Sequence, residues 1–116
     1  MASDGLKAVT GKDCTWHNVA AESTDQIMGN IAQAVADGKP VVANTPGTIT
    51  SPALAWANTA GLTLIAGHSY NVAGANARAR TIDVANPHGR NHLPGLAVGN
   101  FRMVFEWYAV LNSSVR

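Results

Sequence analysis

The chain has 116 residues, enough for one domain, with 47% hydrophobic residues, 13% charged residues and a formal net charge of +1. Such a balance, without a basic stripe, is not typical of a nucleic-acid-binding protein. The apolar runs are far shorter than the roughly 18 residues of a membrane helix, and the first residues have neither the basic start nor the apolar core of a signal peptide. We therefore expect a soluble single domain spanning residues 1–116, with neither nucleic acid nor a membrane as partner.

The low charged fraction has a second implication. Globular domains usually carry charge on roughly a quarter of their residues. We therefore expect part of the surface to be apolar and to face a partner segment, with a second copy of the chain as one candidate.

A single cysteine, Cys14, excludes an internal disulfide and a zinc site built from several cysteines. It is either a structural thiol or a catalytic nucleophile, and His17 lies three residues later. A catalytic thiol is favoured at the start of a buried helix, where the helix N-terminus lowers its pKa, whereas nothing apolar and periodic follows Cys14 until the 20s. The sequence therefore favours the structural interpretation.

The clearest helix is predicted over residues 24–37. Ser23 and Gln26 form a capping-box pattern, while Gly38 and Pro40 are typical of a helix end. Four apolar side chains share one face of this helix: Ile27, Ile31, Ala34 and Val35.

The remaining elements are short and mostly extended. We expect strands at 40–44, 68–74, 81–85 and 101–105, a turn at 86–89, and loops at 45–53 and 90–100. Residues 1–22 read as loops or short extended pieces, 54–66 as a helical turn followed by a strand or loop, and 107–111 as a short helix or a last strand. The fold class expected is α+β: an antiparallel, partly closed sheet with one main helix.

The strands at 68–74 and 81–85 are predicted to pair as a hairpin around Ala77. Matching apolar residues on one face selects a register with these directly opposed pairs: Val72 and Ile82, Tyr70 and Val84, His68 and Asn86. Directly opposed residues have Cβ atoms roughly 5 Å apart. The side chains of His68 and Asn86 are therefore expected to form a hydrogen bond.

A histidine beside an asparagine is suited to thiol chemistry. The carboxamide oxygen accepts a hydrogen bond from one ring nitrogen, which leaves the other nitrogen to take a proton from a thiol. The alternative is a polar pair that only terminates two strands.

Two segments resemble calpain-like cysteine peptidases of the papain superfamily. Residues 67–72 (Gly-His-Ser-Tyr-Asn-Val) are similar to a Gly-His-Ala-Tyr-Ser-Val segment of that family, and residues 82–89 (Ile-Asp-Val-Ala-Asn-Pro-His-Gly) to an Ile-Arg-Leu-Arg-Asn-Pro-Trp-Gly segment. Residues 6–11, the helix at 24–37 and the segment 38–42 extend the similarity. The resemblance implies the second, His/Asn-bearing subdomain of the papain-like architecture.

By this resemblance His68 is the catalytic general base and acid, and Asn86 is the residue that orients it. Peptides or proteins are then the substrate, and neither a cofactor nor a metal is implied. The chain departs from the family in having no cysteine at a helix start and no oxyanion-hole glutamine. His88 stands where the family has a tryptophan, and the calcium-binding acidic loops have no counterpart. We therefore expect a chain that is inactive alone and completed by a cysteine-bearing subdomain from an upstream segment, a separate chain or a second copy.

Three other interpretations are open. The chain is a non-catalytic interaction module derived from a peptidase half, or it is active by itself through Cys14 and His68. A third interpretation is a metal site at His88 and His92. The intervening Gly89 argues against a helix there, and no carboxylate or cysteine joins the pair, so no metal is expected.

Overall fold

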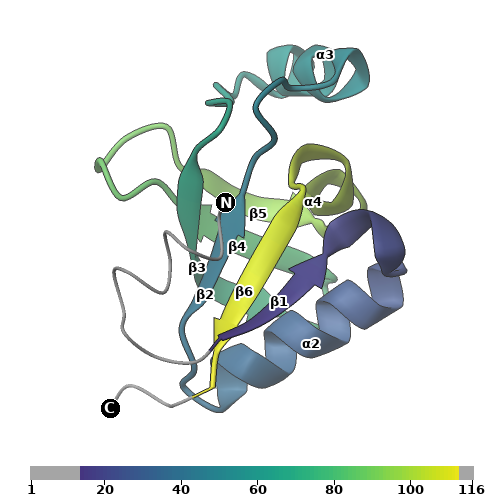
Figure 1. Cartoon of the computed structure of the whole chain (residues 1–116). Helices are drawn as coiled ribbons and strands as arrows, with labels where there is room; N and C mark the ends of the chain where they lie inside the picture. The colour runs from purple at the N-terminus through teal and green to yellow at the C-terminus, as the bar shows by residue number, and fades with distance from the viewer. Residues whose placement is uncertain (1–13, 113–116) are drawn as a thin grey trace.

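The computed structural model describes residues 14–112, which form an α+β fold around one six-stranded antiparallel sheet (Figure 1). In chain order the elements are β1 (Cys14–Asn18), the 3-10 helix η1 (Val19–Ala21), α2 (Thr24–Ala36), β2 (Val41–Asn44), α3 (Ser51–Ala60), β3 (Ser69–Asn76), β4 (Thr81–Ala85), β5 (Leu93–Ala97), α4 (Val98–Val104) and β6 (Trp107–Leu111). The strand order is β1-β6-β2-β3-β4-β5. The class and the antiparallel pairing are confirmed, but the expected partial closure is wrong: the sheet is open, with β1 and β5 at its edges.

Helix α2 begins at the predicted residue, Thr24, and ends at Ala36, one residue before the predicted end. The Gln26 backbone N–H donates to the Ser23 hydroxyl (3.1 Å) and the Ser23 N–H donates to the Gln26 side-chain oxygen (2.8 Å), which completes the capping box. Past its end, Gly38 has a φ of 72°, a left-handed conformation that glycine adopts without a Cβ clash.

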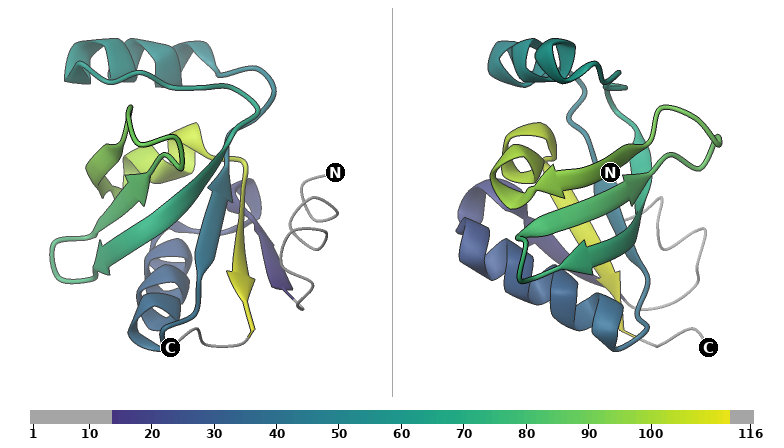
Figure 2. Two further views of the ribbon diagram at one scale, coloured as in Figure 1. Left: turned by 90° about the vertical axis from the view of Figure 1, so that its left-hand side faces the viewer. Right: turned by 180° about the vertical axis from the view of Figure 1, so that it is seen from behind.

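The core lies between the sheet and the two helices α2 and α4, which pack against each other. Ile27 and Ile31 of α2 and Phe101 of α4 are fully buried there against Tyr70 and Tyr108 of the sheet. Helix α3 lies apart from α2, beyond the end of the sheet where β3 begins (Figures 1 and 2). Within residues 14–112, no helix is both long enough and apolar enough to cross a membrane.

The segment after residue 90 differs from the prediction. Residues predicted as loop form β5 and the start of α4, and residues 101–105, predicted as a strand, are helical through Val104. Phe101 and Phe105 are four residues apart, and their rings stack with centroids at 4.6 Å, so the apolar pattern serves one helix face as well as a strand. Pro94 is tolerated in β5 because an edge strand leaves one side of its backbone unpaired.

Helix α3 and strand β6 decide between the alternatives that the sequence left open at residues 54–66 and 107–111. Residues 51–60 form helix α3, so the helix at this point is longer than the expected turn, and Thr50 caps it. Pro52 fits because the first turn of a helix needs no N–H donor. Residues 107–111 form strand β6, in the middle of the sheet between β1 and β2.

The β3–β4 hairpin has the predicted faces but not the predicted register. Val72 pairs with Val84 instead of Ile82, and a β-bulge between Val72 and Gly74 shifts the remaining pairs, so that Ala75 lies opposite Ile82. The shift at Val72 is two residues, an even number, so the side chains keep their faces. Tyr70, Ile82 and Val84 accordingly all lie in the core.

A candidate histidine–asparagine site

His68 lies immediately before β3 and Asn86 immediately after β4, at the same end of the hairpin. Continuing the Asn71–Ala85 pairing by one residue places Asn86 opposite Tyr70, so His68 is its diagonal neighbour. A diagonal neighbour is still within reach of a long side chain, and His68 Nε2 lies 2.9 Å from Asn86 Oδ1. The expected hydrogen bond is therefore present, although the predicted direct opposition is wrong.

The surroundings of Asn86 fix which atoms are donors and which are acceptors. The His88 backbone N–H can only donate, and it lies 3.0 Å from Asn86 Oδ1, so that atom is the carboxamide oxygen. Because this oxygen can only accept, His68 Nε2 must carry a proton. In the neutral ring the lone pair is then on Nδ1, which has no hydrogen-bond partner among residues 14–112.

Aromatic rings enclose the His68 imidazole on two sides. Tyr70 meets it edge-on, with centroids at 4.9 Å and planes at 90°, and the exposed His88 ring stacks on it at 5.3 Å. Burial raises the pKa of Tyr70, and a hydrogen bond from the Ile65 backbone N–H lowers it by less. Tyr70 is therefore a neutral wall of the site near neutral pH.

Thr45 holds the backbone of His68, a role that was not predicted from the sequence. Its hydroxyl accepts from the His68 N–H (2.9 Å) and lies 2.6 Å from the Ile65 carbonyl oxygen, to which it donates. The Thr45 N–H donates to the His68 carbonyl (3.0 Å), so Thr45 contacts both backbone groups of His68. The feature of the sequence that could have indicated this role is a polar residue directly after strand β2. The hydrogen-bond partners of Thr45 lie 20 and 23 residues away along the chain, so no local pattern identifies them.

The loop 86–92 organises itself around Asn86. The Asn86 carbonyl accepts from the Gly89 N–H (3.0 Å), and the Asn86 N–H donates to Nδ1 of His92 (3.0 Å). Asn86 is only 3% exposed, so these bonds satisfy a buried backbone.

The two histidines weighed as a metal pair occupy different places in this loop. His88 stacks on His68, and His92 accepts from the Asn86 backbone. In the part of the chain that the structure describes, no three His, Cys, Asp or Glu side chains are grouped so that they could hold a metal ion.

Cys14 lies far from His68. It is on edge strand β1, three strands from β3, and its pairing with Leu111 places it at the Pro40 end of the sheet, whereas His68 is beside Thr45 at the other end. With strands about 4.8 Å apart and a rise of about 3.3 Å per residue, the separation is on the order of 20 Å. Self-sufficient catalysis through Cys14 and His68 is incompatible with this arrangement.

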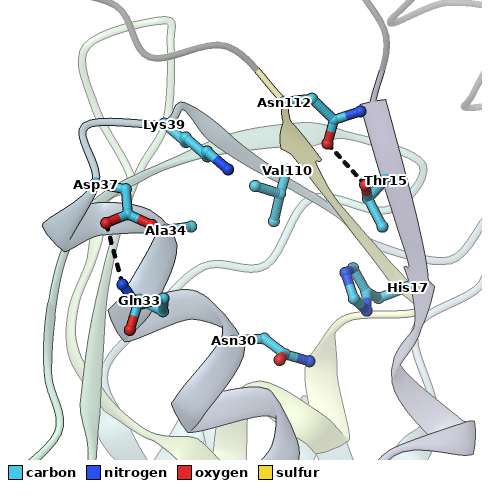
Figure 3. A pocket seen from close by; sticks show the side chains of 9 residues that line it. All are labelled: Thr15, His17, Asn30, Gln33, Ala34, Asp37, Lys39, Val110 and Asn112. Atoms are coloured by element: carbon cyan, nitrogen blue, oxygen red, sulfur yellow. Dashed lines mark hydrogen bonds between the residues drawn. The ribbon is translucent and has the colours of Figure 1, made fainter.

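A second polar region lies between α2 and strands β1 and β6, where nine residues line a hollow of ≈ 190 Å³ (Figure 3). His17 projects from β1 toward this hollow. Its ring stacks on Tyr108 at 4.5 Å, and its Nδ1 lies 2.6 Å from a carboxylate oxygen of Glu22. The lining mixes the cationic Lys39 with the anionic Asp37 and with amides, so its charges favour no single class of ligand.

Tyr108 connects this hollow to the core. Its hydroxyl donates to Glu22 and accepts from the Asn30 side-chain N–H (3.1 Å). Burial raises the pKa of Tyr108 most, and the hydrogen bond to the Glu22 carboxylate raises it further. No local sequence pattern indicates this cluster, because its members are brought together by the pairing of β1 with β6, which are about 90 residues apart in the chain.

Comparison of the sequence with models of known protein families gives no match, and comparison with curated proteins also gives none. The function proposed for the chain therefore depends on the geometry around His68 and Asn86.

Proposed function

We propose that the chain supplies the histidine and the asparagine of a calpain-like cysteine peptidase, and that the cysteine comes from another segment or chain. The observation that carries the proposal is the 2.9 Å hydrogen bond from His68 Nε2 to an Asn86 oxygen whose identity the His88 N–H fixes. A neutral imidazole held in this way presents Nδ1 as its basic atom, as a thiol-activating base requires.

The proposed reaction follows from these atoms. His68 Nδ1 takes the proton of the thiol, and the thiolate attacks the peptide carbonyl carbon. The resulting imidazolium returns the proton to the leaving amine as the C–N bond breaks, which leaves a thioester. Water attacks the thioester with Nδ1 again as base, which releases the acid and regenerates the thiol. Asn86 keeps the Nε2 proton in place throughout and remains neutral.

The replacement at His88 changes the cover of the site. The imidazole that stacks on His68 is smaller and more polar than the tryptophan of the family, and it is exposed. We expect the His68–Asn86 pair to be less shielded from water than in the family.

The test combines the chain with the cysteine-bearing polypeptide encoded upstream of it or beside it, and measures cleavage of fluorescently labelled casein. The chain alone should be inactive, and the combination should be active. His68→Ala should lower kcat/KM by roughly 10²–10⁴-fold, the usual contribution of a positioned acid–base group. Cys14→Ser is the matched control and should leave activity unchanged.

Two results would overturn the proposal. The first is an active combination in which His68→Ala retains full activity. The second is a tight, inactive complex whose affinity is unchanged by His68→Ala, which would favour the non-catalytic interaction module. Cleavage by the chain alone that is lost in His68→Ala would contradict the expectation that it is inactive without a partner.

A further inference from the structure

Beyond the His68–Asn86 pair, the loop contains a third residue that determines where Asn86 lies. The side chain of Asn86 emerges at the end of β4, where the ladder to β3 no longer fixes the backbone. Its position there depends on three local hydrogen bonds, from the Gly89 and His88 N–H groups and to His92 Nδ1. The bonds from His88 and Gly89 span at most three residues, whereas the bond to His92 joins the two ends of the loop 86–92.

The His92 bond differs from the other two because its acceptor can be protonated. A backbone N–H can only donate, so Nδ1 of His92 must carry a lone pair. Protonation converts Nδ1 into a donor, and the bond to the Asn86 N–H is then impossible. His92 is exposed, so protons from solvent reach it.

We infer that His92 is a positioning residue for the proposed peptidase site: its neutral imidazole holds Asn86 in the place where it orients His68, and protonation of His92 releases Asn86. This inference rests on the proposed function for its catalytic meaning. Its structural content, a link between the charge of His92 and the position of Asn86, does not depend on any reaction.

Other charged and titratable groups flank the loop. Strand β5 has none and β3 has only the buried Tyr70, whereas β4 contributes Asp83, whose carboxylate accepts from the Gly95 N–H (2.6 Å). The remaining groups are His68 before β3, and His88 and Arg90 in the loop itself. His88 is a second imidazole in the same loop, so the test must isolate His92.

Two variants of His92 distinguish its contribution from that of His88. His92→Asn places an amide oxygen near the position of Nδ1, so it keeps an acceptor that does not titrate. His92→Phe keeps a planar ring without an acceptor. The measurements are the hydrogen-exchange protection factor of the Asn86 amide and the ¹⁵N shifts of the His68 ring, at pH 8 and pH 5.5, on the chain alone.

At pH 8 we expect the wild type and His92→Asn to protect the Asn86 amide at least about 10-fold more than His92→Phe does. At pH 5.5 the wild type should lose that protection and His92→Asn should retain it. At pH 8, His92→Phe should also lose the ¹⁵N pattern of a single Nε2–H tautomer at His68.

Equal protection of Asn86 in the wild type and His92→Phe at pH 8 would overturn the inference, as would an equal pH response in the wild type and His92→Asn. If His92→Phe does not fold, the wild type and His92→Asn alone decide the question. These measurements need neither thiol nor substrate, so they are independent of the casein assay. If that assay fails while the protection pattern is as expected, the peptidase proposal is wrong and the link between His92 and Asn86 stands.

Discussion

Two side chains at the His68 site, those of Thr45 and His92, act through backbone groups. Thr45, which is 4% exposed, bonds both the N–H and the carbonyl of His68, and His92 bonds the N–H of Asn86. Buried backbone groups are costly to leave unpaired, so such residues fix the main chain that carries the functional side chains. The ring of His68 is thus oriented by Asn86 and its backbone by Thr45.

Replacing Thr45 tests this backbone role. Thr45→Val preserves the shape but removes the acceptor for the His68 N–H and the donor to Ile65, so we expect a loss of roughly 1–3 kcal/mol in the free energy of unfolding. Urea denaturation followed by circular dichroism measures it. Thr45→Ser keeps the hydroxyl, so its free energy of unfolding should fall clearly less than that of Thr45→Val. An equal fall in both variants would contradict the role of the hydroxyl and would assign the effect to the methyl group.

Tyr108 makes the free energy of unfolding depend on pH in the alkaline range. Because burial and the Glu22 carboxylate raise its pKa in the folded chain, the unfolded chain releases the phenolic proton first, at about pH 10. The stabilisation is complete below that pH and is lost as the pH rises further. Urea midpoints measured from pH 8 to 11 should fall, and Tyr108→Phe should show a shallower fall; an identical slope would contradict the assignment.

At the scale of elements, the termini of α2 are specified by nearby residues, whereas the strands depend on their neighbours. The capping box at Ser23 and the left-handed Gly38 lie within a few residues of the helix they bound. The bulge between Val72 and Gly74 instead arises where β3 pairs with β4. Gly74 has Asp83 beside it, and the same carboxylate bonds Gly95 in β5.

The cap gives a quantitative prediction for α2. Ser23→Ala removes one acceptor and leaves the Gln26 N–H unpaired, so we expect about 1 kcal/mol of destabilisation by thermal or urea unfolding. The control at the same helix end is Arg80→Ala, which removes the exposed ion pair with Asp25. Exposed pairs contribute little, so its effect should stay below about 0.5 kcal/mol. A larger loss from Arg80→Ala than from Ser23→Ala would reverse this ranking.

For the whole molecule, stability is concentrated between the sheet and helices α2 and α4, while α3 extends past the end of the sheet (Figures 1 and 2). The open sheet leaves β1 and β5 as edges, and the His68 site lies at the end of the sheet where the chain coming from α3 enters β3. The cysteine-bearing partner that we propose would therefore bind at this end of the sheet.

Two apolar truncations measure this uneven distribution. Ile31 is fully buried, so Ile31→Ala should cost roughly 2–5 kcal/mol. Leu54 on α3 is 50% exposed, so Leu54→Ala should cost less than about 1 kcal/mol. Urea denaturation of both variants checks the difference, and comparable losses would place α3 in the cooperative core.

The sequence by itself determined the elements whose signals are local. Capping residues and a 3.6-residue period specified α2, and alternation specified β3 and β4. Alternation also placed His68 and Asn86 on one face, which an even shift of register does not change. The predicted contact therefore formed even though the predicted pairs were wrong.

Only the tertiary structure decided the rest. Apolar residues four positions apart near Phe101 are compatible with either a strand or a helix. The choice between the two depends on what the segment packs against, and here it forms α4, which packs against α2. The strand order of the open sheet and the hydrogen bonds of Thr45 and Tyr108 join segments that are distant in the chain. No short window of sequence contains both members of such a contact, so the physical reason for these features exists only once the chain has folded.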